Sequence, residues 1–181
     1  MATKTRLAAG TVRLRRMYLD CCLGQLHLTT AFPPSGGFDE RTALLFLHDD
    51  GGSGADFRRC AALLGSDRSV YAPDLPGSGA SDGPAGCVTV ANLVAAITDL
   101  LDQLGLREVD IFGCGHGALV ACELAAVRLK EIRRLIIAGS QQPATPPSQP
   151  TLILDEDAAL ALSDRAEPMV ARIRAFLDQA S

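Results

Sequence analysis

The sequence contains no run of about 18 apolar residues, and this absence excludes a membrane-spanning helix. It also lacks a C-x-x-C pair and has only three histidines, His27, His48 and His116, so the ligand spacings of zinc sites are missing. We therefore expect no metal and no cofactor. The net charge of -4 gives no basic surface for a nucleic acid. No apolar secretory segment follows Met1, so we expect a cytoplasmic protein with reduced cysteines.

Positive charge is concentrated at the start of the chain. Residues 1–19 contain no acidic residue and five basic ones, which are Lys4, Arg6, Arg13, Arg15 and Arg16. An arginine-rich and acid-poor start is typical of a transit peptide. The alternation of apolar and basic residues from Val12 onward instead favours a strand with one solvated face.

The periodicity of the apolar residues predicts the fold class. Segments 12–19 and 25–31 alternate and predict an antiparallel hairpin. Beyond them, short apolar runs alternate with helical spacing, which is typical of a parallel sheet with crossover helices. The expected strands are 42–47, 69–72, 109–112, 134–138 and 151–154, and the expected helices are 55–64, 90–104, 118–130 and 168–177. We predict an α/β fold, a mostly parallel sheet with flanking helices and an N-terminal antiparallel hairpin, in a single domain over residues 1–181.

A glycine-rich stretch from Ile111 to Ala118 lies between an expected strand and an expected helix. Its glycines fit the dinucleotide-binding fingerprint G-x-G-x-x-G/A, but that motif needs an acidic residue at the end of the next strand. Residues 133–140 contain none. The same stretch fits the nucleophile elbow G-x-S-x-G, with Gly115 at the nucleophile position. Glycine has no side chain that could attack a substrate, and Cys114 lies one residue too early in the motif.

Two upstream segments carry a resemblance to a known family. Residues 70–84, Val-Tyr-Ala-Pro-Asp-Leu-Pro-Gly-Ser-Gly-Ala-Ser-Asp-Gly-Pro, resemble the loop after the fourth strand in the α/β-hydrolase superfamily. Residues 45–54, Leu-Phe-Leu-His-Asp-Asp-Gly-Gly-Ser-Gly, resemble that family's third strand and oxyanion loop. The resemblance extends from about Met17 to Leu177 and implies an α/β-hydrolase-like core.

The resemblance also implies where catalytic residues should lie, and this chain departs from the pattern at each position. The nucleophile position is Gly115, and the family's usual His-Gly in the oxyanion loop is replaced by His48-Asp49. A carboxylate at this place would repel a developing oxyanion. The general-base histidine should fall near Ala161, yet no histidine follows His116. The acidic cluster 155–157 then has no histidine to orient.

These departures predict a trimmed α/β-hydrolase that lacks the catalytic serine and histidine. The helical cap that the family usually carries is replaced by the short connector 139–150. We therefore expect a non-catalytic binding or scaffolding protein with no catalytic residues. A small apolar ligand would lie at the residues around the elbow, which are His48, Asp49, Gly115 and His116. The alternative is an atypical esterase-like hydrolase or a lyase that uses Cys114, His116 or a carboxylate of Asp49 or Asp50.

The last expected strand, 151–154, predicts an interaction edge. In the family this strand is covered by a further strand, which the remaining sequence is too short to supply. An apolar edge with unpaired backbone groups is a template for strand addition. We expect a homodimer or a protein partner at residues 151–154, unless segment 155–163 folds back over the edge.

Overall fold

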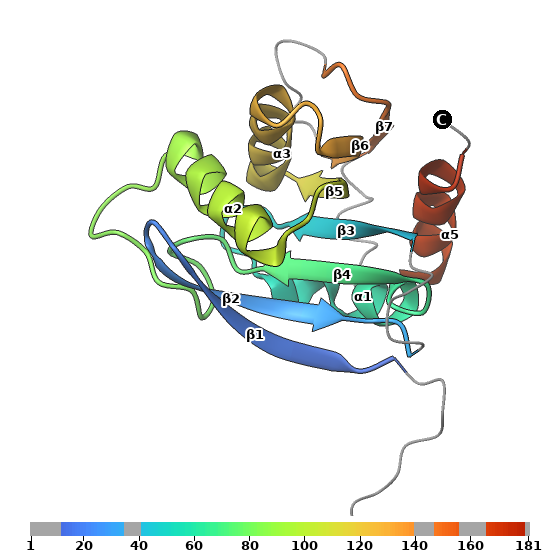
Figure 1. Ribbon diagram of the computed structural model, residues 1–181, viewed down its shortest axis with the longest axis horizontal. Helices are drawn as coiled ribbons and strands as arrows, with labels where there is room; N and C mark the ends of the chain where they lie inside the picture. The colour runs from blue at the N-terminus through green and yellow to red at the C-terminus, as the bar shows by residue number, and fades with distance from the viewer. Residues whose placement is uncertain (1–11, 35–40, 140–146, 156–165, 180–181) are drawn as a thin grey trace, which may run out of the picture.

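The computed structural model describes residues 12–34, 41–139, 147–155 and 166–179, and its centre is a seven-stranded sheet in the order β1-β2-β4-β3-β5-β6-β7 (Figure 1). The strands are β1 (Leu14–Cys21), β2 (Gly24–Ala31), β3 (Arg41–Leu47), β4 (Arg68–Pro73), β5 (Val109–Cys114), β6 (Ile132–Ala138) and β7 (Thr151–Leu154). The pairs β1–β2 and β2–β4 are antiparallel, and every other neighbouring pair is parallel. The predicted fold class is confirmed.

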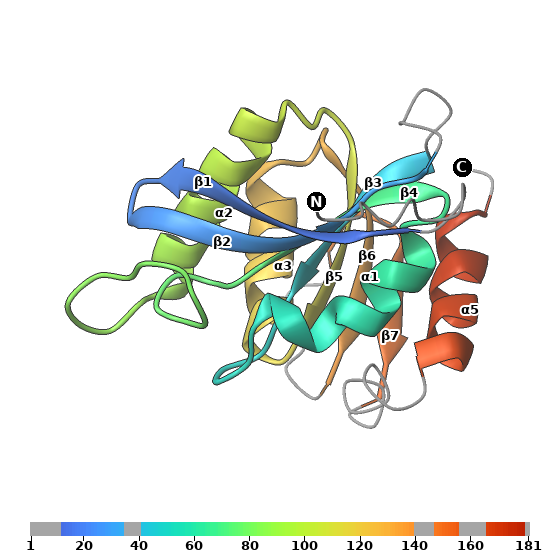
Figure 2. The same ribbon diagram turned by 90° about the horizontal axis from the view of Figure 1, so that it is seen from below.

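Helices cover both faces of this sheet (Figures 1 and 2). Helices α2 (Val90–Leu104) and α3 (His116–Val127) pack on one face, where they share a core cluster with Leu45 and Ile111. The 3₁₀ turn η1 (Gly54–Phe57), α1 (Arg58–Leu64) and α5 (Ala166–Leu177) cover the other face. Because the strand side chains alternate between the two faces, the sheet is buried on both sides, as the continuous apolar strands predict.

Local sequence signals set the ends of α2. Thr89 caps the first turn by accepting the Asn92 N–H at 3.2 Å, and Gly105 ends the helix at φ +64°. Threonine and glycine are residue types preferred at helix starts and ends, respectively. α2 therefore has the bounds that the apolar spacing predicts.

Three helices differ from their predicted bounds, and one of them is α5, which begins at Ala166 where the sequence predicted residue 168. The segment predicted as one helix over 55–64 begins as a 3₁₀ turn, because Ser53 and Asp56 form a capping box that fixes a tighter first turn. The helix predicted over 118–130 instead spans His116–Val127. It starts earlier because Gly115 allows an abrupt turn out of β5, and it ends earlier because Arg128 leaves the helical conformation at φ -116° and ψ +45°.

Some predicted features lie outside the described residues. Most of the connector 139–150, the acids at 156 and 157 and the position of Ala161 belong to this group. Among the residues that the structure does describe, no helix is long and apolar enough to cross a membrane. The predicted cytoplasmic location stays a prediction.

Candidate functional site

The chain makes its sharpest turn where β5 passes into α3. Gly115 has φ +50° and ψ -119°, a conformation that side-chain-bearing residues adopt only under strain. A Cβ at Gly117 would overlap the backbone carbonyl groups of Leu47 and His48. Glycine at these two positions therefore lets α3 begin directly against the carboxyl end of β3.

Asp49 occupies the space that a side chain at position 115 would need. A Cβ placed on Gly115 would overlap the Asp49 carboxylate. Asp49 Oδ1 accepts the backbone N–H of His116 at 2.6 Å and the backbone N–H of Asp50 at 2.8 Å. The first donor belongs to the amino-terminal turn of α3, where the helix dipole favours a negative charge. Two backbone N–H groups therefore donate to the same side-chain oxygen, Asp49 Oδ1.

His48 fixes the backbone of the loop that carries Asp49. Its imidazole is buried, and Nε2 accepts the backbone N–H of Leu75 at 2.8 Å. Nδ1 lies 2.7 Å from the carbonyl oxygen of Asp49 and must donate to it. Both ring nitrogens therefore form hydrogen bonds with backbone atoms, and the side chain links the loop after β3 to the loop after β4.

A buried carboxylate also anchors the loop after β4. Asp74 accepts the backbone N–H groups of Gly54 and Ala80, each at 2.8 Å, and its Oδ2 lies 2.9 Å from Nδ1 of His27. The contact between His27 and Asp74 was not predicted, because the two residues are separated by 47 positions and neither belongs to a motif with the other.

Cys114, the last residue of β5, faces the packed interior between the sheet and the layer of α1 and α5. Burial, assisted by the negative charge of Asp49, raises the pKa of its thiol to about 12. The sulfur lies 3.6 Å from the carbonyl oxygen of Leu47. A thiol that stays protonated near neutral pH is a poor nucleophile.

The side chain of His116 is only partly exposed, at 25%. Its Nδ1 lies 3.3 Å from Asp50 Oδ1, and the Asp50 side chain is 90% exposed. An ion pair of this kind contributes little stability. The backbone N–H of His116 is bonded to Asp49 and is therefore not open to a ligand.

The four residues expected around the elbow, His48, Asp49, Gly115 and His116, do meet at the carboxyl ends of β3 and β5. Asp50 joins them through His116. Within the described parts of the chain, no group of three or more His, Cys, Asp or Glu side chains is arranged to hold a metal ion. The roles of these residues in binding stay predictions.

Similarity to known proteins agrees with this geometry. A sequence profile described as the alpha/beta hydrolase fold matches residues 42–176. A 2-hydroxymuconate semialdehyde hydrolase of Pseudomonas putida is 39% identical over 74 residues, which are 40% of this chain and 26% of that protein. An uncharacterised protein of Mycobacterium tuberculosis is 33% identical over 98 residues, which are 54% of this chain and 29% of that protein.

Solved structures show the same fold. The N-acyl homoserine lactonase AidH, in a serine-to-glycine variant complexed with N-hexanoyl homoserine lactone, superposes with a TM-score of 0.60 at 28% identity, covering 74% of this chain and 46% of that one. The epoxide hydrolase VrEH1 of Vigna radiata gives a TM-score of 0.65 at 24% identity, covering 74% and 41%. The chain spans less than half the length of each of these four proteins. Because the profile covers most of the sequence and the sheet order and elbow agree with it, this chain belongs to the alpha/beta hydrolase fold family.

Proposed function

We propose that this chain is a non-catalytic binding protein built on the α/β-hydrolase fold. The observation that carries the proposal is the Asp49 carboxylate, which fills the side-chain space above Gly115 and takes the backbone N–H of His116. Acyl transfer by this type of elbow needs a nucleophile and hydrogen-bond donors for the oxyanion. Here position 115 has no side chain, and the backbone N–H of His116 already donates to the carboxylate of Asp49.

The same carboxylate limits the chemistry of the ligand. A substrate carbonyl could reach the N–H groups of His116 and Asp50 only after Asp49 had given up both hydrogen bonds. An anionic ligand would in addition meet the charges of Asp49 and Asp50. A neutral, largely apolar ligand that donates a hydrogen bond to Asp49 fits this arrangement best. The lactonase variant that has lost a serine and still holds N-hexanoyl homoserine lactone supports binding without hydrolysis on this fold.

The alternative function is an atypical hydrolase, and the names of the relatives favour it. The Pseudomonas putida relative is a semialdehyde hydrolase and the structural neighbours include epoxide hydrolases. Such an enzyme would depend on Cys114, His116 or the carboxylates of Asp49 and Asp50. The raised pKa of the Cys114 thiol counts against the first of these groups.

Two measurements on the purified chain test the proposal. Incubation with a fluorophosphonate probe should give no stoichiometric label, and short-chain p-nitrophenyl esters should show no turnover above that of the Asp49→Asn variant. N-hexanoyl homoserine lactone, titrated by calorimetry and recovered for mass spectrometry, should bind and leave unchanged. Turnover that disappears in Asp49→Asn or Cys114→Ser would instead establish the hydrolase, and a failure to bind any neutral acyl ligand would refute the binding role.

A further inference from the structure

A cavity of about 280 Å³ lies beside the N-terminal hairpin, away from the elbow. We call it the hairpin cavity. Its polar lining consists of Arg15, Arg16, Tyr18, His27, Thr29 and Arg58, and none of its lining residues is acidic. The side chains of Arg16 and Arg58, without a carboxylate in the wall, give the cavity a positive potential.

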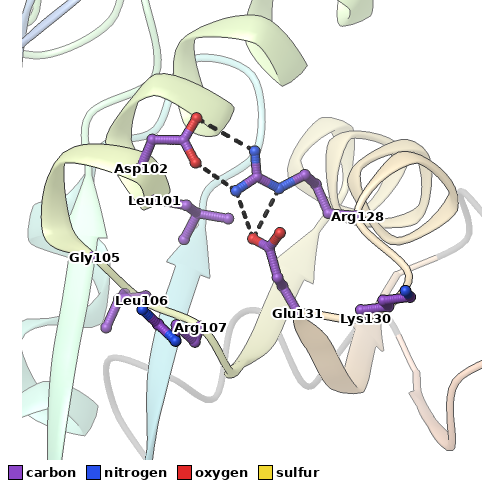
Figure 3. Close-up of a pocket in the computed structure, with 8 residues that line it drawn as sticks. All are labelled: Leu101, Asp102, Gly105, Leu106, Arg107, Arg128, Lys130 and Glu131. Carbon is purple, nitrogen blue, oxygen red and sulfur yellow. Dashed lines mark hydrogen bonds and ion pairs between the residues drawn. The ribbon is translucent and has the colours of Figure 1, made fainter.

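Two of these arginines are free to bind a ligand. Arg15 lies over the ring of Phe32 on the other face of the hairpin, with 5.8 Å between its guanidinium carbon and the ring centre. Arg16 and Arg58 form no ion pair or hydrogen bond within the described part of the chain. Arg128, which lines a hollow at the far ends of α2 and α3, is different (Figure 3). Its guanidinium is already bound by Asp102 and Glu131, so it has little capacity left for a ligand.

His27 forms part of the cavity wall and is held in place by Asp74. Asp74 Oδ2 lies 2.9 Å from its Nδ1, and the carboxylate can only accept, so Nδ1 carries the proton. Nε2 has no partner among the described residues.

An apolar surface adjoins these donors. The ring of Tyr18 packs against the imidazole of His27, with 5.1 Å between the ring centres, and Leu14 continues the wall. Tyr18 is half exposed, so one face of its ring is open to a planar or aliphatic group. A ligand that has an anionic head and a small apolar body would use both parts of the cavity.

We propose that the hairpin cavity binds a small organic phosphate monoester, with its phosphate between Arg16 and Arg58 and its organic group against Tyr18 and His27. Guanidinium groups match the tetrahedral oxygens of a phosphate through paired hydrogen bonds. A dianion also balances the charges of two arginines that have no acidic partner. This inference is independent of the proposed function, because the cavity shares no lining residue with the elbow.

Calorimetric titration of the whole chain with phenyl phosphate tests the proposal. Loss of a charge-assisted contact should weaken binding about tenfold in Arg16→Gln and again in Arg58→Gln. The matched controls are Arg13→Gln and Arg172→Gln, which remove the same charge from exposed arginines outside the cavity. They should bind phenyl phosphate within about twofold of the unmodified chain.

Further titrations distinguish the contribution of the phosphate from that of the organic group. Benzyl alcohol should not bind, and inorganic phosphate should bind more weakly than phenyl phosphate. In imidazole NMR spectra, the signals of His27 should shift on titration and those of His116 should stay. Equal weakening by the control and cavity variants, equal affinity for phosphate and phenyl phosphate, or an unchanged His27 signal would each overturn the assignment.

Discussion

The carboxylate of Asp49 accepts the backbone N–H of His116 at 2.6 Å, although the two residues are 67 positions apart in the sequence. This contact joins the loop after β3 to the first turn of α3. It places a negative charge at the first backbone N–H of α3, and the carboxylate closes over Gly115. The binding function proposed for this chain depends on that contact.

A serine at the elbow should be difficult to accommodate. In Gly115→Ser, the new side chain needs the space of the Asp49 carboxylate and a strained backbone conformation at φ +50°. We expect a loss of about 2–3 kcal/mol in the free energy of unfolding, measured in urea. Gly51→Ser is the control, because Gly51 also has a positive φ, +71°, but has open space around its Cβ position. It should cost about 1 kcal/mol.

The double variant Asp49→Gly/Gly115→Ser separates the two contributions. Removal of the carboxylate should relieve the overlap, so the double variant should be more stable than the sum of the single changes predicts. Additive losses would show that the serine does not compete with Asp49 for the same space. We expect neither variant to hydrolyse esters, because a serine without a general base is a weak nucleophile.

Cys114 should react slowly in the folded protein. Burial raises the pKa of its thiol to about 12, so almost none of it is thiolate at pH 8. Iodoacetamide, followed by peptide mass spectrometry, should modify the exposed Cys87 first and should reach Cys114 only in denaturant. Faster modification of Cys114 than of Cys87 in native buffer would favour the hydrolase alternative.

Arg133 contacts two carboxylates that should differ widely in their contribution to stability. Asp110 is fully buried and accepts Nε of Arg133 at 2.9 Å, whereas Glu108 is 58% exposed and 3.6 Å away. Asp110→Ala leaves an uncompensated charge near the core and should reduce the free energy of unfolding by about 3–5 kcal/mol. Glu108→Ala should reduce it by less than about 1 kcal/mol. Similar losses in urea unfolding would contradict this ranking.

β7 should mediate self-association. It is the last strand of the described sheet, and Ile153 is 54% exposed on it. Pairing of two copies along this edge would form backbone hydrogen bonds to β7 and bury Ile153. Light scattering after size exclusion should show a dimer that Ile153→Lys dissociates. Val127→Lys changes a residue that is 64% exposed on α3 and should leave the dimer intact. A monomer at high micromolar concentration would refute the interface.

Much of this fold follows from local features of the sequence. The continuous apolar run in β3 requires a sheet that is buried on both faces, and the helical spacing after Thr89 requires a crossover helix. Thr89 and Gly105 act within one turn of their own positions, so their capping roles are visible in the sequence. The glycine-rich turn at 113–117 indicates an elbow for the same reason.

Only the tertiary structure decides what occupies that elbow. Asp49 and His116 meet because the parallel register of β3 and β5 brings the loops after these strands together. His27 meets Asp74 because the antiparallel pairing of β2 with β4 places the end of β4 beside His27. Spacing along the sequence does not specify such distances. An aspartate has the same local backbone preferences whether its carboxylate faces solvent or accepts hydrogen bonds from two backbone N–H groups. The α/β architecture and the glycine at position 115 can be read from the amino-acid sequence alone. Packing between loops determined that the Asp49 carboxylate closes over this glycine, and that His27 is held at the wall of a cationic cavity.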